Sequence, residues 1–229
     1  MKKGGPLTGR FITFEGIDGA GKSTHLSRCA QWLRDHGIAV VVTREPGGTE
    51  LGEAIRDWFL HQPTDARTEA LLAFAARSDH LERLVRPALA AGEWVVCDRF
   101  TDSTVAYQGA GRGLGADRVE QLEQWLHPDL RPDRTYLFDL DPAEAARRRA
   151  SARAADRFEA EDIAFFTRVR AGYQARMAAE AAPTVPGGGA RGLHRRMLAI
   201  DASGEPEAIW RQLEEDLDFC RQLWTSDAR

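Results

Sequence analysis

The chain has 229 residues, of which 43% are hydrophobic and 29% are charged, and its formal net charge at pH 7 is −4. This composition excludes a disordered chain and is sufficient for one substantial core, so we predict a single soluble domain. The slightly acidic balance argues against a surface built for nucleic acid or anionic membrane, and we expect neither as a partner.

The first residues and the cysteines bear on location. The segment MKKGGPLTGR is basic, but the apolar run after it is too short for a signal peptide. We expect residues 1–10 to be a frayed tail and residues 11–229 to form the single domain. No run approaches the ~20 apolar residues that span a membrane. The cysteines lack metal-ligand spacing and are typical of buried residues in a reducing, cytoplasmic location; they are Cys29, Cys97 and Cys220.

Strand-like apolar runs alternate with longer helical segments along the chain. This alternation is typical of an α/β fold, in which helices cover both faces of a parallel sheet. Near-continuous apolar runs, without strict alternation, indicate strands that are buried on both faces. In chain order, strands are expected at residues 11–15, 38–43, 93–98, 134–140 and, with a weaker pattern, 197–201.

Apolar residues at helical spacing mark the segments between these strands. A helix is expected after the first strand, and a long one over about residues 66–91. A final helix places one apolar face toward the core, with Ile209, Leu213, Leu217, Cys220 and Trp224.

Two stretches depart from this alternation. RRRASARAADRFE, residues 147–159, is dense in arginine. PTVPGGGARGLHRR, residues 183–196, predicts an exposed loop, because consecutive glycines lose too much conformational freedom in a regular element. Neither stretch indicates a domain boundary.

A glycine-rich loop, within FEGIDGAGKST, lies between the first strand and the first helix. Its glycines let backbone N–H groups converge on phosphate oxygens at a helix N-terminus. Lys22 would bring a positive charge to the outer phosphates, and the Ser23 hydroxyl would ligate a Mg²⁺ ion that bridges them. The pattern predicts a nucleoside triphosphate site formed by Gly16, Ile17, Asp18, Gly19, Ala20, Gly21, Lys22, Ser23 and Thr24.

The carboxylate of Asp18 is unexpected inside a loop that binds anions, because it repels phosphate unless a cation or a hydroxyl faces it. It would bind metal, orient Lys22 or contact a substrate hydroxyl. The alternative is a turn residue that faces solvent.

Charged side chains lie at the ends of the second and third strands. Arg44 and Glu45 precede the turn in TREPGGT, Asp98 closes the apolar run EWVVCD, and Arg99 is the next residue. Open α/β sheets bind ligands at this carboxyl edge. Asp98 would reach Mg²⁺ directly or through water, and Arg99 can bind a second phosphate. Two arginines besides the loop lysine predict a second, phosphorylated substrate.

Two further segments carry side chains that suit a nucleobase. LAFAARSDH contains Phe74 and Arg77 within one helical turn, and STVAYQGAGRG contains Tyr107 and Gln108 before a glycine-rich turn. Together they would form a stacking face and a donor to a base carbonyl. The alternatives are a core aromatic for Phe74 and a solvated helix charge for Arg77.

These motifs occur in the order found in thymidylate kinases, and the chain resembles a bacterial member of that family. The resemblance rests on FEGIDGAGKST, TREPGGT, FAAR, DRF with ST, AYQGAGRG, RPDRTYLFDLDP and DRFE, and it covers roughly residues 11–176. It implies a P-loop kinase fold with a five-stranded parallel sheet and a short lid, typically homodimeric. It also implies Mg²⁺-dependent transfer of a phosphoryl group from ATP to thymidine monophosphate (dTMP), in dTTP synthesis for DNA replication.

The resemblance also implies a role for each matching residue. Lys22 would bridge the donor and acceptor phosphates, with Asp18 on the acceptor side. Arg99 and Arg44 would hold the acceptor phosphate. The base would contact the remaining residues, with Phe74 stacking on it, Arg77 donating to its carbonyl, Ser103, Thr104 and Gln108 bordering it, and Tyr107 crowding the ribose 2′ position.

Family members place their catalytic arginine either in the phosphate loop or in a mobile lid. Gly19 occupies the loop position here, so the resemblance implies the lid arrangement, with the lid at about residues 147–159. Lid closure would add positive charge to a loose transition state and exclude water. The arginines are Arg147, Arg148, Arg149 and Arg153, of which we expect Arg153 to be catalytic, and Glu159 would orient groups or bind metal.

Two alternatives to this function are a kinase of the same fold that acts on another monophosphate or a nucleoside, and a nucleotide-dependent switch. The first would differ around Phe74, Arg77 and Tyr107. The second is disfavoured because NKxD is absent and, after the glycine-rich loop, a DxxG-like string occurs only at residues 201–204. The loop at residues 183–196 is longer than the family pattern leads us to expect.

Overall fold

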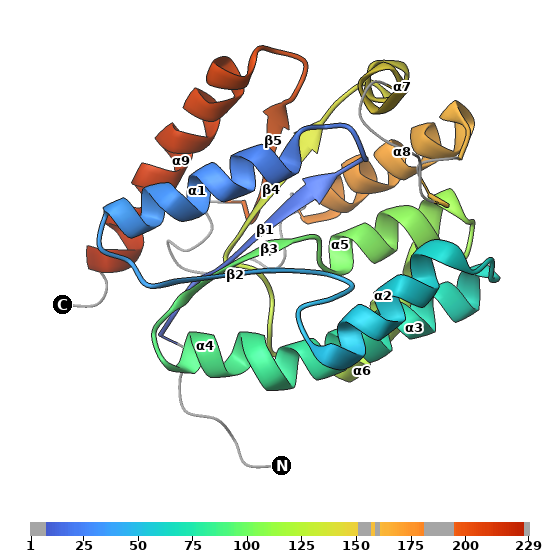
Figure 1. Cartoon of the computed structure of the whole chain (residues 1–229), viewed down its shortest axis with the longest axis horizontal. Coiled ribbons are helices and arrows are strands. Elements are labelled where there is room, and N and C mark those ends of the chain that lie inside the picture. Colours follow the sequence, from blue (N-terminus) through green and yellow to red (C-terminus); the bar gives the residue numbers. More distant parts are fainter. Residues whose placement is uncertain (1–7, 151–156, 159–160, 181–194, 227–229) are drawn as a thin grey trace.

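The computed structural model describes residues 8–150, 157–158, 161–180 and 195–226, which are arranged around a parallel β-sheet (Figure 1). The strands pair in the order β2-β3-β1-β4-β5, and every pair is parallel. The predicted five-stranded α/β sheet is therefore confirmed. The strands are β1 (Phe11–Gly16), β2 (Val40–Arg44), β3 (Trp94–Asp98), β4 (Arg134–Asp139) and β5 (Met197–Asp201).

Helices fill the connections between the strands, because parallel strands need long crossover connections. They are α1 (Lys22–Asp35), α2 (Glu50–His61), α3 (Ala66–His80), α4 (Arg86–Ala90), α5 (Thr101–Thr104), α6 (Ala116–Leu126), α7 (Pro142–Ala150), α8 (Ile163–Glu180) and α9 (Pro206–Ser226). Two π-helical segments, η1 (Leu81–Val85) and η2 (Val105–Gly111), extend α3 and α5.

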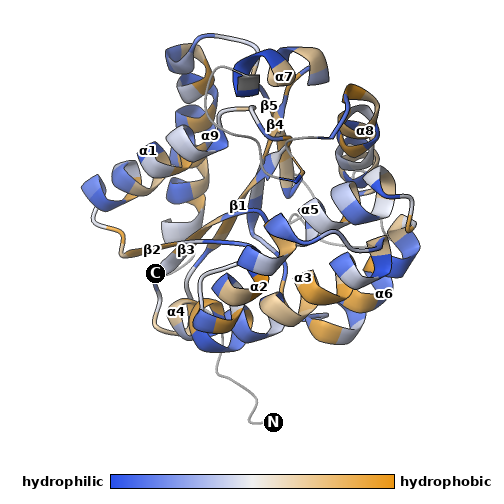
Figure 2. Cartoon of the chain, turned by 45° about the vertical axis from the view of Figure 1, so that its right-hand side comes forward, coloured by the Kyte–Doolittle hydropathy of each residue, from blue (hydrophilic) through white to orange (hydrophobic). Residues whose placement is uncertain are grey.

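The centre of the sheet is its most buried part. Every residue of β1 is buried, whereas the edge strand β2 keeps partly exposed positions. Helices α1 and α9 pack on one face, and α4, α5 and α8 lie on the other (Figure 1). Hydrophilic and hydrophobic residues share the same helices in Figure 2, as expected for helices that cover a core.

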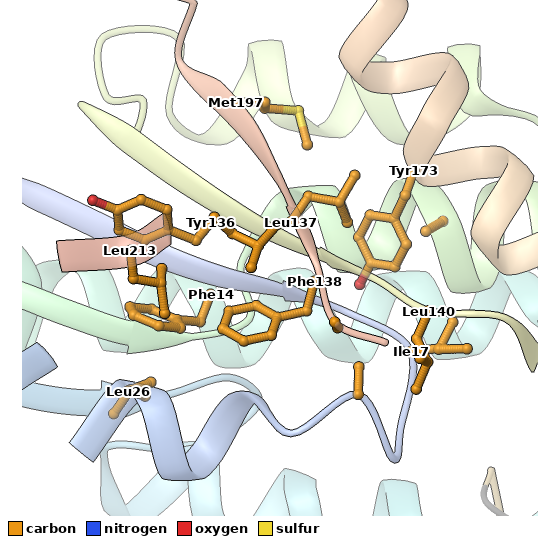
Figure 3. Close-up of a cluster of buried hydrophobic side chains, with 14 of the residues drawn as sticks. Phe14, Ile17, Leu26, Tyr136, Leu137, Phe138, Leu140, Tyr173, Met197 and Leu213 are labelled. Atoms are coloured by element: carbon orange, nitrogen blue, oxygen red, sulfur yellow. The ribbon is translucent and has the colours of Figure 1, made fainter. Parts of the chain in front are cut away.

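The core lies between the sheet and these helices. Figure 3 shows Phe14 of β1 beside Phe138 of β4, and the two ring centroids are 5.8 Å apart. Leu213 of α9 and Tyr173 of α8 approach the same strands from the helical layers. The three cysteines are free and buried, as predicted.

Most predicted strands differ by one residue at an end, and two larger differences each have a local reason. The second strand begins at Val40, not residue 38, because the backbone N–H of Ile38 still bonds to the carbonyl of Leu33 at the end of α1. The predicted helix over residues 66–91 passes through η1, where the N–H of Arg86 reaches back to the carbonyl of Leu81. The wider turn precedes Pro87, which lacks an N–H and crowds the preceding turn.

The end of the predicted tail is anchored to the domain. The N–H groups of Thr8 and Gly9 bond to the carbonyl of Leu89, and Arg10 pairs with Asp133 at 3.0 Å. Residues 8–10 are therefore part of the packed structure rather than frayed, and residues 1–7 lie outside the described part of the chain. Among the described residues, no helix has the length and apolar character to cross a membrane.

Candidate active site

The glycine-rich loop turns sharply between β1 and α1. Gly16, Gly19 and Gly21 have φ values of 131°, 90° and 87°, which side-chain-bearing residues rarely adopt. A Cβ on Gly16 would also lie 2.5 Å from the carbonyl oxygen of Phe138 on β4. Helix α1 has neither a side-chain cap nor an acidic residue in its first turn. Its first N–H groups are therefore left for an anion.

The side chain of Lys22 lies over this loop. Its Nζ donates to the carbonyl oxygens of Gly16 and Ile17, at 3.0 and 3.1 Å. Burial and the nearby charge of Arg99 lower the pKa of Lys22. The contacts hold the ammonium group at the mouth of the loop, where a phosphate would bind.

Asp18 is paired with a cation and a hydroxyl rather than exposed to solvent. Arg99 donates to its Oδ1 at 2.5 Å, and the hydroxyl of Tyr107 donates to its Oδ2 at 2.9 Å. Burial alone would raise the pKa of Asp18, but the charges of Arg99 and Lys22 lower it to about 2. Arg99 thus provides the cation that a carboxylate in an anion-binding loop requires, and Asp18 stays ionised.

Arg99 is held in an unusual backbone conformation directly after β3. Its φ is 69°, which is uncommon for a residue with a side chain and often marks functional sites. Its Nη1 donates to the carbonyl of Gly16 and to the hydroxyls of Ser103 and Tyr173. These contacts direct the guanidinium along the loop instead of into solvent.

A buried carboxylate, Glu15, lies beneath Arg99. The N–H of Phe100 and the hydroxyls of Ser103 and Tyr173 donate to it, at 2.7, 2.5 and 2.9 Å. Burial, together with repulsion from Asp102, raises the pKa of Glu15 to about 7. Because two of its donors also contact Arg99, Glu15 supports the position of that guanidinium.

A pocket opens next to the loop and collects most of the predicted acceptor residues. Its wall includes Arg77 from α3 and a set of residues from β3 to η2. Arg77 is only 2% exposed, and its Nη1 has no hydrogen-bond partner in the described part of the chain. The predicted residues that line the pocket are Asp18, Arg77, Arg99, Ser103, Thr104, Tyr107 and Gln108.

Phe74 lies behind this wall. It packs in a small cluster with Val105 and Val119, and it is not among the described residues that line the pocket. The guanidinium of Arg77 lies over its ring, 4.6 Å from the centroid. In the structure Phe74 therefore supports Arg77, and its predicted stacking on a base stays a prediction.

The pocket includes residues that the sequence did not single out. Arg56 and Phe59 reach it from α2, and Phe158 reaches it from the predicted lid. Burial and the charges of Arg44 and Arg99 lower the pKa of Arg56. The sequence could have indicated Arg56 and Phe59, because they lie three residues apart on the helix that follows TREPGGT and such residues share a helical face.

Arg44 lies in a second cavity, apart from Arg99. It pairs with Glu53 at 2.8 Å, and the same cavity is lined by Ser23 and Asp98. The buried Oδ1 of Asp98 has no partner among the residues that are described. The structure thus brings together the predicted metal ligands Ser23 and Asp98, while Arg56 rather than Arg44 lines the acceptor pocket.

Helix α7 brings one arginine to the phosphate-binding loop. Arg149 Nη1 donates to the carbonyl oxygen of Asp18 at 2.6 Å, and its guanidinium lies 4.1 Å from the ring centroid of Phe166. Gly19 packs against α7 so closely that a Cβ would lie 2.6 Å from the carbonyl of Ala145. Arg147 instead pairs with Glu144 on the surface. Arg153 and Glu159 lie outside the described residues.

The described end of the lid is fastened to α2 and α3. Arg157 donates to Glu69 at 2.8 Å and to the carbonyl of Phe59 at 3.0 Å. The ring of Phe158 stacks on that of Phe59, with centroids 5.1 Å apart. Phe158, in the described part of this segment, therefore forms part of the pocket wall.

Comparisons with known proteins agree with this site. The family model for thymidylate kinase matches residues 14–185. A thymidylate kinase of Bordetella pertussis is 53% identical over 210 residues, 91% of this chain and 94% of that protein. One of Ralstonia pickettii is 58% identical, covering 91% and 97%. A crystal structure of thymidylate kinase from Ehrlichia chaffeensis, 31% identical, superposes with a TM-score of 0.71 over 92% of this chain and 98% of that one. The chain therefore belongs to the thymidylate kinase family.

Proposed function

We propose that the glycine-rich loop holds ATP and that the adjacent pocket holds dTMP. The chain catalyses the ATP-dependent phosphorylation of dTMP to dTDP, the reaction of its family. The observation that supports the residue assignment is the place of Arg99, which binds Asp18 of the loop and also lines the pocket. The donor and acceptor phosphates would meet at this shared cation. We assign the reaction to dTTP synthesis for DNA replication, in the cytoplasm.

The pocket supplies groups that suit each part of dTMP. Arg77 would donate from its Nη1 to a base carbonyl, and Gln108 would border the same edge of the base. The Tyr107 ring would crowd the ribose 2′ position. Arg56 and Arg99 would bind the acceptor phosphate, as their common place in the pocket wall supports.

Catalysis would consist mainly of positioning and of positive charge around the transferred phosphoryl group. Lys22 is held over the loop, Arg99 lies between the two sites, and Arg149 approaches from α7. We propose that Arg149 acts in the lid together with Arg153. Asp18 would keep Arg99 oriented and leave its charge available near the acceptor.

The described residues fit a Mg²⁺ ion at the loop. Ser23 and Asp98 line one cavity, and Asp98 has a buried oxygen without a hydrogen bond to the described residues. Mg²⁺ commonly binds one or two protein oxygens together with substrate phosphates and water. We propose these residues as its protein contacts, with Glu159 as a further candidate. When bound, the ion would neutralise charge on the donor phosphates.

The acceptor assignment is tested by measuring ADP release with ATP, Mg²⁺ and a panel of monophosphates. We expect kcat/KM for dTMP to exceed that for dCMP by at least about a hundredfold, because a buried donor rejects a base that presents an amino group at its carbonyl position. UMP and GMP should also be poor acceptors, and ADP release without a monophosphate should be slow. A preference for UMP or GMP over dTMP would refute the assignment.

We also propose that the chain forms a homodimer, as the resemblance implies. Large apolar side chains are exposed on α2, α3 and α6. Helix α3 packs against both α2 and α6 (Figure 2). Exposed apolar patches of this kind commonly mark protein interfaces. The residues are Leu51, Trp58, Leu71 and Trp125.

A further inference from the structure

A buried chain of polar contacts extends from β2 to the acceptor pocket. Thr43 Oγ1 lies 2.7 Å from His80 Nε2, and His80 Nδ1 lies 2.8 Å from Glu45 Oε1. Arg77 Nε donates to the other oxygen, Glu45 Oε2, at 2.8 Å. His80 is fully buried, and Glu45 and Arg77 are nearly so. Two segments that are distant in the sequence, the end of β2 and the end of α3, thus meet behind one guanidinium.

The contacts set the proton positions in this chain. Burial alone would raise the pKa of Glu45, but the charge of Arg77 and the hydrogen bond from His80 lower it, so the carboxylate is ionised at neutral pH and only accepts hydrogen bonds. His80 Nδ1 must therefore carry the hydrogen that lies between it and Glu45. Both oxygens of Glu45 are thereby held, one by His80 and one by Arg77, which fixes the plane of the carboxylate.

The guanidinium of Arg77 is confined on several sides. Its Nη2 donates to Thr104 Oγ1 at 3.1 Å, and the rings of Phe74 and Phe100 lie 4.6 and 5.0 Å from its carbon. Only Nη1 has no partner among the described residues, and Arg77 lines the pocket. The direction of that one donor therefore depends on how firmly Glu45 holds Nε.

The fold leaves space for this arrangement. Gly48 has a φ of 79°, and a Cβ there would lie 2.5 Å from Thr43 Oγ1 and 2.8 Å from His80 Nε2. Any side chain at this position would strike the pair that anchors the far end of the chain. The turn after β2 thus leaves room for His80, because Gly48 carries no side chain.

We propose that His80 is a positioning residue that sets the base specificity of the pocket by orienting Glu45, and through it the Nη1 donor of Arg77. The inference rests on the proposed acceptor function of the pocket. His80 does not line the pocket, so it acts through Arg77 and touches neither base nor phosphate. The pocket would bind a pyrimidine nucleotide that presents a carbonyl oxygen to the Nη1 donor of Arg77.

The test compares two variants of similar size. In His80→Asn the amide nitrogen lies near the place of Nδ1 and can still donate to Glu45, whereas in His80→Gln the amide lies near the place of Nε2. We expect His80→Gln to raise KM for dTMP about tenfold, the effect of one lost hydrogen bond to a charged group, with kcat and KM for ATP within about twofold. His80→Asn should retain dTMP affinity within about threefold of the wild type.

The same variants are titrated with dTMP and with dCMP by calorimetry. His80→Gln should weaken dTMP binding about tenfold and leave dCMP binding within about twofold, because dCMP presents an amino group, which is a donor, in place of the carbonyl oxygen that Arg77 would contact. Equal weakening of both nucleotides would overturn the inference, since it indicates a packing role. Equal behaviour of the Asn and Gln variants, or an unchanged dTMP to dCMP ratio in His80→Gln, would also overturn it.

A third variant covers the case in which His80→Gln does not fold. Thr43→Val removes the hydroxyl and nearly keeps the shape of the side chain. It should weaken the binding of dTMP about two- to threefold and leave the binding of dCMP unchanged. An equal effect on dCMP would contradict the inference. The proposed function is judged separately, from the wild type alone, because a wild type that prefers a different monophosphate refutes that assignment whatever the variants show.

Discussion

At the scale of single residues, the charge state of the buried side chain of Glu15 depends on the fold. Burial, with repulsion from Asp102, raises its pKa from an ordinary 4.5 to about 7. Ionising Glu15 therefore costs more in the folded chain than in the unfolded chain. Its contribution to stability is complete below about pH 4.5 and is lost as the pH rises through about 7.

Replacing Glu15 with glutamine removes this titration. Between pH 5 and 8 the unfolding free energy of Glu15→Gln should rise, relative to the wild type, by on the order of 2 kcal/mol. Lost hydrogen bonds to Ser103 and Tyr173 add a penalty that does not vary with pH. Urea unfolding followed by circular dichroism at each pH unit measures the difference, and Asp18, with a pKa of about 2, stays ionised throughout. Parallel curves for the two proteins would contradict the prediction.

At the scale of elements, α7 is the helix that connects the lid to the phosphate-binding loop. The tight contact at Gly19 leaves no room for a side chain at that position of the loop, and Arg149 of α7 reaches the backbone of the neighbouring Asp18. The positive charge that the loop lacks is thus brought by the packing of a neighbouring helix.

Arg149→Ala should lower kcat on the order of a hundredfold, the loss typical of one donor to a developing charge, while the affinity for ATP changes little. Steady-state ADP release and ATP titration measure the two effects. Arg147→Ala is the matched control, because Arg147 lies on the same helix, is 70% exposed and pairs with Glu144. It should retain kcat within about twofold. Equal losses in both variants would argue against a specific role, and an unchanged Arg149→Ala would leave that role to Arg153.

At the scale of the whole molecule, the exposed apolar side chains of α2, α3 and α6 predict self-association. The mass in solution, measured by analytical ultracentrifugation, should be twice the 25.4 kDa of one chain. Leu71→Glu places a charge in this face and should shift the chain to monomer, because an unpaired charge is costly in an apolar interface. Phe219→Glu alters an exposed apolar residue on α9, across the molecule in Figure 1, and should leave the dimer intact. A wild-type monomer would contradict the prediction.

The fold was predictable where short-range patterns suffice. The strands were recognisable because burial on both faces demands continuous apolar runs, and the loop because Gly16, Gly19 and Gly21 must adopt positive φ. The start of the second strand was missed because Ile38 bonds back to α1. The boundary between a helix and the next strand depends on backbone hydrogen bonds, which the periodicity of the side chains does not indicate.

The residue pattern alone was enough to predict the α/β architecture, the phosphate-binding loop and the presence of cations and aromatics at the carboxyl edge of the sheet, since these depend on residue order along one strand and its turn. Which of these cations meet depends on how the helices pack. Arg56 lines the pocket and Arg44 does not, and Arg149 contacts the loop. The hydrogen bond between His80 and Glu45 likewise depends on tertiary packing. The reason is that side chains from separate segments meet only when helix packing sets their distances, and spacing in sequence carries no record of that.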